Sequence, residues 1–203
     1  MNEAGIIFNL VVKLKSFLLL SNKIGYLFKK DLQQSLRKAE SYSRLDQFKR
    51  WVPSIIIFLI ALYWVINHSQ YGLLDNIDLV IHESGHFFFS FFGKFIYTLG
   101  GTLMQIILPS IIALFFFRNN YRTGVQFSSL WLGQNFINIS VYAADAQARK
   151  LPLLGGDKVY HDWHYMLDEI GILQYDYLVG YFFFGISILI FIITVFMPLI
   201  TRD

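Results

Sequence analysis

Five consecutive residues of this chain combine the side chains that a hydrolytic zinc site requires: His82-Glu83-Ser84-Gly85-His86. Residues four apart lie one above the other on a helix, so His82 and His86 can bind one ion. Glu83 then lies beside the open coordination position, where its carboxylate can take a proton from a zinc-bound water. The motif therefore predicts a zinc (Zn²⁺) site with His82 and His86 as ligands and Glu83 as the general base.

The same five residues have a second interpretation, in which a His/Glu cluster forms hydrogen bonds between helices and binds no metal. Gly85 offers a small surface that another helix or a substrate backbone could approach closely. Two imidazoles and a carboxylate are costly at the mouth of an apolar segment, and ionisable groups in such a setting indicate a functional site. We therefore favour the zinc site over the structural cluster.

Composition indicates what surrounds the motif and which further ligands are available. Of the 203 residues, 55% are apolar and only 15% are charged, so part of the surface must face the lipid bilayer. The chain has no cysteine, which leaves His, Asp and Glu as ligands. The N-terminus lacks the initial basic region and the small-residue cleavage site of a secretory signal. We expect an integral membrane protein.

Positive charge is concentrated before the first strongly apolar segment, with ten of the 17 Lys and Arg residues between Lys13 and Arg50. No nucleic-acid recognition motif accompanies this run, and the positive-inside rule assigns it to the cytoplasmic side of a membrane. Residues 5–20 predict an amphipathic helix on the membrane surface. We expect residues 1–50 to form a basic juxtamembrane helical region and residues 51–203 a membrane-embedded domain.

The apolar segments of the second region predict an all-α, multi-pass transmembrane helical bundle with about four to five membrane segments. They are residues 51–67, 79–99, 101–117, 125–143 and 177–200. The fourth segment is unusually polar, so Gln134, Asn135 and Asn138 must face the bundle interior or a wet cavity. We expect Asn135 and Asn138 to bind substrate by hydrogen-bonding an extended backbone or an oxyanion. Hydrogen bonding between helices is the alternative.

The stretch H-E-S-G-H-F, followed after a hydrophobic run by L-G-G-T-L-M-Q, resembles the site-2 protease-like intramembrane zinc metallopeptidases. The resemblance extends over about residues 79–173. In that superfamily an H-E-x-G-H helix is followed by a Gly-rich segment and, much later, by an Asp that completes the zinc site. The resemblance therefore implies an Asp as the third ligand and a peptide or membrane-protein substrate.

The third ligand can be narrowed but not assigned from the sequence. Glu169 is the only Glu after the motif, and it lacks the E-x-x-x-D pattern of prenyl-protease-type membrane zincins, because Leu173 stands four residues later. That comparison also favours an Asp. Asp162 is the first choice, because it opens a predicted helix, D-W-H-Y-M-L-D-E-I-G-I-L, similar to the segment after the ligand Asp in one branch of the superfamily.

Three other residues remain candidates for the third ligand. Asp145 closes the polar fourth segment, seven residues after Asn138, loosely like the N-x-x-P…D-G pattern of the superfamily. His161 is chemically competent as a ligand, and Asp157 follows a Gly-Gly pair, where a turn residue is the alternative.

The order of the segments raises a geometric question about this ligand. If residues 79–99, 101–117 and 125–143 all cross fully, residues 144–162 lie on the membrane face opposite the mouth of the motif segment. A re-entrant segment 79–98, turning at Gly93-Lys94 or Gly100-Gly101, would return Asp162 to the side of the motif. Non-helical backbone is tolerated at membrane depth where it lines a protein-enclosed cavity.

These observations favour a membrane-embedded zinc metalloendopeptidase, in which a zinc-bound water activated by Glu83 hydrolyses peptide bonds. The alternative is a non-catalytic membrane protein of the same ancestry, with a structural metal or a polar cluster. Glu83 argues against that alternative, because a structural zinc site needs the ligands but not the base. A channel or transporter is disfavoured, since the chain shows no inverted repeat.

Overall fold

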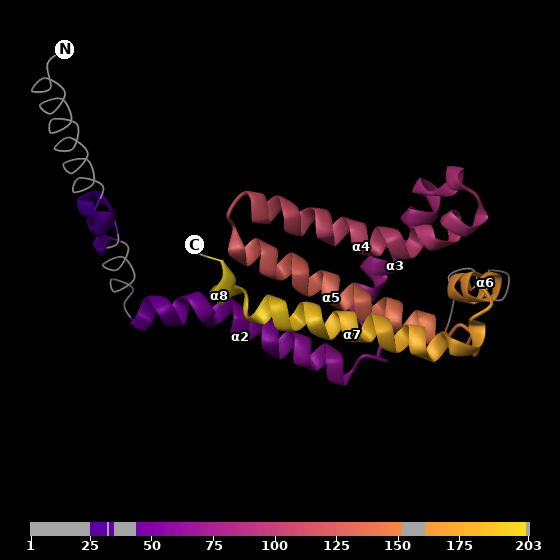
Figure 1. Cartoon of the computed structure of the whole chain (residues 1–203). Coiled ribbons are helices and arrows are strands. Elements are labelled where there is room, and N and C mark those ends of the chain that lie inside the picture. The colour runs from indigo at the N-terminus through magenta and orange to yellow at the C-terminus, as the bar shows by residue number, and fades with distance from the viewer. Residues whose placement is uncertain (1–24, 32, 35–43, 152–160, 202–203) are drawn as a thin grey trace, which may run out of the picture. The chain divides into compact units, whose positions relative to one another are not determined.

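A computed structural model describes residues 25–31, 33–34, 44–151 and 161–201 (Figure 1), and within these ranges the chain forms helices and no strand. The prediction of an all-α helical bundle is confirmed. The chain divides into two compact units, Met1–Arg50 and Trp51–Asp203, and the site described below lies in the second. The surface helix predicted for residues 5–20 lies outside the described residues.

Residues 25–31 and 33–34 are helical. From residue 44 onwards the helices are α2 (Arg44–Ile66), α3 (Leu73–Phe88), the short 3₁₀ turn η1 (Ser90–Phe92), α4 (Lys94–Arg118), α5 (Arg122–Ala144), α6 (Asp162–Glu169), the 3₁₀ turn η3 (Leu173–Tyr175), α7 (Asp176–Val195) and α8 (Met197–Ile200).

Among the described residues, three stretches of helix are long and apolar enough to cross a membrane: Asp46–Ile66, Lys94–Arg118 and Leu173–Val195. This finding indicates a membrane protein. The segments predicted at 79–99 and 125–143 do not qualify, although helices occupy them. The helix that carries the motif, α3, has only 16 residues, and α5 has many polar residues along its length.

The chain turns between α3 and α4 at Phe89–Gly93. The predicted segment boundary placed this turn at Gly100. Gly93 has a φ of +84°, a backbone conformation that glycine adopts without a steric penalty. The predicted boundary between residues 99 and 101 is wrong because Gly100 and Gly101 lie inside α4, where small residues permit close helix packing. Gly93 was one of the two turn positions considered.

Gly85 is the point at which α3 and α4 make backbone contact. A Cβ atom at this position would overlap the carbonyl group of Gly100. Of the two partners considered for Gly85, the structure therefore shows a neighbouring helix. Close contact at this point aligns the last two turns of α3, which hold the motif, against the first half of α4.

A hydrophobic cluster attaches α6 to the end of the bundle where α5 ends and α4 begins (Figure 1). Trp163, Met166 and Leu167 of α6 are buried against Ala143 at the end of α5, and Leu99 of α4 packs against the same cluster. The α3–α4 turn lies at this end as well, because α4 starts directly after it. Asp162, at the start of α6, therefore reaches the motif. Re-entry of residues 79–98 stays a prediction.

Replacing Gly85 with alanine tests the α3–α4 contact. The added methyl group meets backbone atoms of Gly100, which cannot rotate away, so the helices must separate, and we expect a loss of about 1–3 kcal/mol in stability. Gly185 on α7 is the matched control, because nothing lies within 4 Å of a Cβ atom there. Thermal unfolding of both variants in detergent, followed by circular dichroism, should show a lower midpoint for Gly85→Ala alone. Equal midpoints would contradict the packing described.

Candidate metal centre

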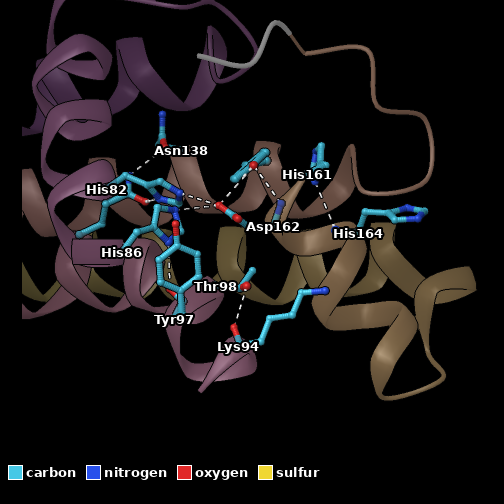
Figure 2. Close-up of polar contacts among 11 residues, drawn as sticks. His82, His86, Lys94, Tyr97, Thr98, Asn138, His161, Asp162 and His164 are labelled. Atoms are coloured by element: carbon cyan, nitrogen blue, oxygen red, sulfur yellow. Dashed lines mark hydrogen bonds and ion pairs between the residues drawn. The ribbon is translucent and has the colours of Figure 1, made fainter. Parts of the chain in front are cut away.

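Three of the predicted site residues, His82, His86 and Asp162, lie together (Figure 2). Nε2 of His82 is 2.8 Å and Nε2 of His86 is 3.2 Å from the same oxygen, Oδ2 of Asp162. The two histidines lie one helical turn apart on α3 and are buried, with exposed fractions of 5% and 9%. The structure thus brings the motif and the first-choice third residue to one point.

The other ring nitrogen of each histidine is held by an acceptor from α4. Nδ1 of His86 lies 2.8 Å from the backbone carbonyl oxygen of Tyr97, and Nδ1 of His82 lies 3.0 Å from Oε1 of Gln105. A carbonyl oxygen can only accept, so both Nδ1 atoms carry hydrogen and donate it. Metal-binding histidines typically donate one ring N–H in this way, which orients the other nitrogen towards the ion.

The resulting arrangement brings acceptors together and calls for positive charge between them. When Nδ1 carries the hydrogen of a neutral ring, Nε2 presents a lone pair, and it faces the carboxylate oxygen of Asp162. Protons on both rings would supply that charge, but the two ring centroids are only 4.9 Å apart, and like charges at that distance repel. A single cation bound by all three groups avoids this repulsion.

Two of the three separations between the ligand atoms are close to those of a zinc site. Zinc bonds of about 2.0–2.1 Å at tetrahedral angles place the ligand atoms about 3.3 Å apart. The observed Nε2–Oδ2 separations of 2.8 and 3.2 Å are close to that value. Two imidazoles and one carboxylate also form a common ligand set of hydrolytic zinc sites, which keep a fourth position open.

Asp162 is held in place by Tyr142 of α5. The backbone N–H of Asp162 donates to the Tyr142 hydroxyl oxygen at 3.1 Å, and that hydroxyl lies 3.5 Å from Oδ2. Burial raises the pKa of the Asp162 carboxyl, but positive charge at His82 and His86 outweighs burial and holds that pKa below its usual range. The carboxyl group is therefore ionised at neutral pH, as a metal ligand must be.

Glu83 differs from the buried residues of the motif because its side chain is exposed. No hydrogen bond or ion pair holds Glu83 among the residues that the structure describes. Glu83 follows His82 directly in α3 and belongs to the same helical turn as the two histidines. A carboxylate that is exposed and has no fixed partner among the described residues is accessible to water.

The other candidates for the third ligand lie elsewhere or are not described. Asp145 accepts hydrogen bonds from the backbone N–H groups of Lys150 and Leu151, at 3.0 and 2.9 Å, and so closes the turn after α5. Nε2 of His161 lies 3.6 Å from Asp145, and burial lowers the pKa of His161 despite that carboxylate. Neither residue belongs to the His82–His86–Asp162 cluster. Asp157 lies outside the described residues.

The two asparagines predicted to bind substrate are engaged inside the protein. Asn138 accepts a hydrogen bond from Gln105 at 2.9 Å and donates one to Asp75 at 3.0 Å, while Asn135 is fully buried. Gln134 likewise donates to Asp75, at 2.9 Å. These contacts use the oxygen and one N–H of Asn138 to connect α4, α5 and α3, so they favour the alternative considered for these residues, hydrogen bonding between helices.

Sequence reasoning did not find three residues that hold the cluster: Tyr97, Gln105 and Tyr142. Gln105 carried a signal, because a polar side chain in the apolar α4 segment is costly unless it has a partner. Tyr97 contributes only its backbone carbonyl, which any residue could supply. Tyr142 contacts Asp162 across 20 residues of chain, and nothing in the sequence indicates that pairing.

Comparisons with protein-family models, with curated proteins and with solved structures find no match to this chain. The case for its function therefore rests on the chemistry and geometry of the site.

Proposed function

We propose that the chain is a membrane-embedded zinc metalloendopeptidase of the site-2 protease-like type. The observation that carries this proposal is the approach of two imidazole Nε2 atoms to one carboxylate oxygen, with Nδ1 of each ring held by an acceptor. His82, His86 and Asp162 would hold the ion. Zn²⁺ in such a site lowers the pKa of water towards neutrality and polarises a peptide carbonyl.

The exposed Glu83 supplies the proton transfers of the reaction. Its carboxylate accepts a proton from the water molecule whose oxygen attacks the carbonyl carbon, and it returns that proton to the nitrogen that leaves when the C–N bond breaks. Glu83 also separates this proposal from the non-catalytic alternative. A structural metal site uses the same ligands but has no need of a nearby carboxylate without a partner.

The position of the cluster along α4 supports action within a membrane. Tyr97 and Gln105, which hold the two histidines, lie three and eleven residues after Lys94, the first residue of a candidate membrane span. At 1.5 Å per residue, the cluster lies about 5 to 16 Å along this helix from its start. A substrate reaching this depth is a peptide or a membrane protein with an apolar segment.

The proposal includes a multi-pass topology with the basic N-terminal region in the cytoplasm. Three candidate spans support more than one crossing. The concentration of Lys and Arg between residues 13 and 50 supports the orientation, because positively charged segments next to a span stay on the cytoplasmic side.

Hydrolysis by the full chain tests this function. The purified protein is reconstituted in phosphatidylcholine vesicles with a pool of single-span peptides in ¹⁸O-labelled water, and products are identified by mass spectrometry. We expect new C-termini that carry ¹⁸O, their loss after treatment with 1,10-phenanthroline, and their return when Zn²⁺ is restored. A zinc-loaded protein that cleaves no peptide of the pool would contradict the peptidase and favour the non-catalytic alternative.

A further inference from the structure

A continuous chain of hydrogen bonds connects His82 to a second carboxylate at the start of α3. Nδ1 of His82 donates to Oε1 of Gln105 at 3.0 Å, and Nε2 of Gln105 donates to Oδ1 of Asn138 at 2.9 Å. Nδ2 of Asn138 then donates to Oδ1 of Asp75 at 3.0 Å. These hydrogen bonds thus connect α3 to α4, α4 to α5, and α5 back to α3 (the His82 end is drawn in Figure 2).

All three bonds have the same direction, with each donor pointing towards Asp75. Each amide accepts on its oxygen and donates from its nitrogen, so the two amide dipoles are aligned. In a chain of this kind every bond polarises the next and strengthens it. The negative charge of the Asp75 carboxylate therefore acts on the imidazole of His82, although the two residues do not touch.

Asp75 is fixed at the far end of the chain by other donors. Its Oδ1 also accepts from Nε2 of Gln134 at 2.9 Å, and its Oδ2 accepts from the backbone N–H of Gly72. An acceptor-only group with three N–H donors is well satisfied and cannot rotate freely. The end of the chain is thus an anchored anion rather than a mobile surface carboxylate.

The two histidines differ in this respect. His86 donates to a backbone carbonyl, which is neutral and fixed by α4 itself. His82 donates to the side chain of Gln105, which is connected through Asn138 to the negatively charged carboxylate of Asp75. The acceptor behind His82 can therefore be altered by changing side chains, whereas the acceptor behind His86 is backbone.

We propose that Asp75, acting through Asn138 and Gln105, is a positioning residue that orients His82 and strengthens its Nε2 atom as a ligand of a bound metal ion. This inference rests on the proposed zinc site. Acceptors behind a metal-binding histidine fix its tautomer and increase its strength as a ligand. The carboxylate usually contacts the histidine directly, whereas here two amides transmit its effect.

The test compares the zinc affinity of Asp75→Asn with that of Asp78→Asn in the full chain. Asparagine at position 75 keeps an oxygen for Asn138 but removes the charge, and we expect zinc to bind about 10- to 100-fold more weakly. Asp78 is the matched control, because it is a buried carboxylate on the same helix that accepts from Trp131 at 2.9 Å and shares Gln134 with Asp75, but it is not one of the residues that connect Asp75 to His82. Its variant should bind zinc as wild type does. Competition with a chromophoric chelator measures both affinities, and the Co²⁺ absorption spectrum should shift for Asp75→Asn alone.

A double variant distinguishes transmitted charge from local folding. Glutamate at position 105 places a carboxylate directly against Nδ1 of His82, so Asp75→Asn with Gln105→Glu should recover most of the lost affinity. Three results would overturn this inference but leave the proposed function standing. They are wild-type zinc affinity in Asp75→Asn, equal losses of affinity in Asp75→Asn and Asp78→Asn, and no recovery of affinity in the double variant. A wild-type chain that binds no zinc would overturn the proposed function with it.

Discussion

Replacing Glu83 with glutamine is expected to lower the rate of peptide hydrolysis by about 10²- to 10⁴-fold, the usual contribution of a general base. Glutamine has nearly the same shape but cannot accept the proton of the attacking water. Glu83 is exposed and has no fixed partner among the described residues, so its loss should leave the His82–His86–Asp162 cluster intact. Zinc content should therefore equal that of wild type.

Glu169→Gln provides the matched control for this experiment. Glu169 is exposed at the end of α6 and lies outside the metal cluster, so the same chemical change should not affect the rate. Both variants are assayed with the vesicle-reconstituted peptide pool, and zinc is measured by mass spectrometry on the same samples. A wild-type rate of hydrolysis by Glu83→Gln would show that Glu83 is not the general base. Loss of zinc from the Glu83→Gln variant would instead show that Glu83 contributes to metal binding.

The helices could be predicted from the sequence because apolar length and polar interruptions are local properties. The turn between α3 and α4 could not, because the residues H-F-F-F-S-F-F-G-K are mostly apolar and read as a continuation of the segment. The reversal depends on the positive φ of Gly93, whereas the more conspicuous Gly100-Gly101 pair serves helix packing. Composition cannot distinguish these two uses of glycine.

The site residues likewise fall into those that local spacing predicts and those that depend on how the helices pack. His82 and His86 were predictable because their spacing on one helix determines their relation. Asp162 was only the first of several choices, because its approach depends on how α6 docks through Trp163, Met166 and Leu167. Asn138 was predicted to bind substrate, with hydrogen bonding between helices as the alternative, and its partners could not be predicted because Gln105 and Asp75 lie on other helices.

The central claim is that His82, His86 and Asp162 hold a metal ion, and Asp162→Asn tests it most strongly. The change removes the charge of the third ligand, and the amide nitrogen or oxygen that replaces Oδ2 is a weaker donor to zinc. We expect zinc affinity to fall by at least about 100-fold, which is more than we expect for a residue that acts on a ligand through other side chains, such as Asp75. Asp145→Asn makes the same substitution at a carboxylate that closes the turn after α5. It should leave zinc affinity unchanged.

The decisive measurement is zinc per chain in purified wild type, Asp162→Asn and Asp145→Asn, with circular dichroism as a check that each variant stays helical. The site described here predicts one zinc per chain in wild type and Asp145→Asn, and almost none in folded Asp162→Asn. One zinc retained by Asp162→Asn, or none bound by wild type, would contradict it.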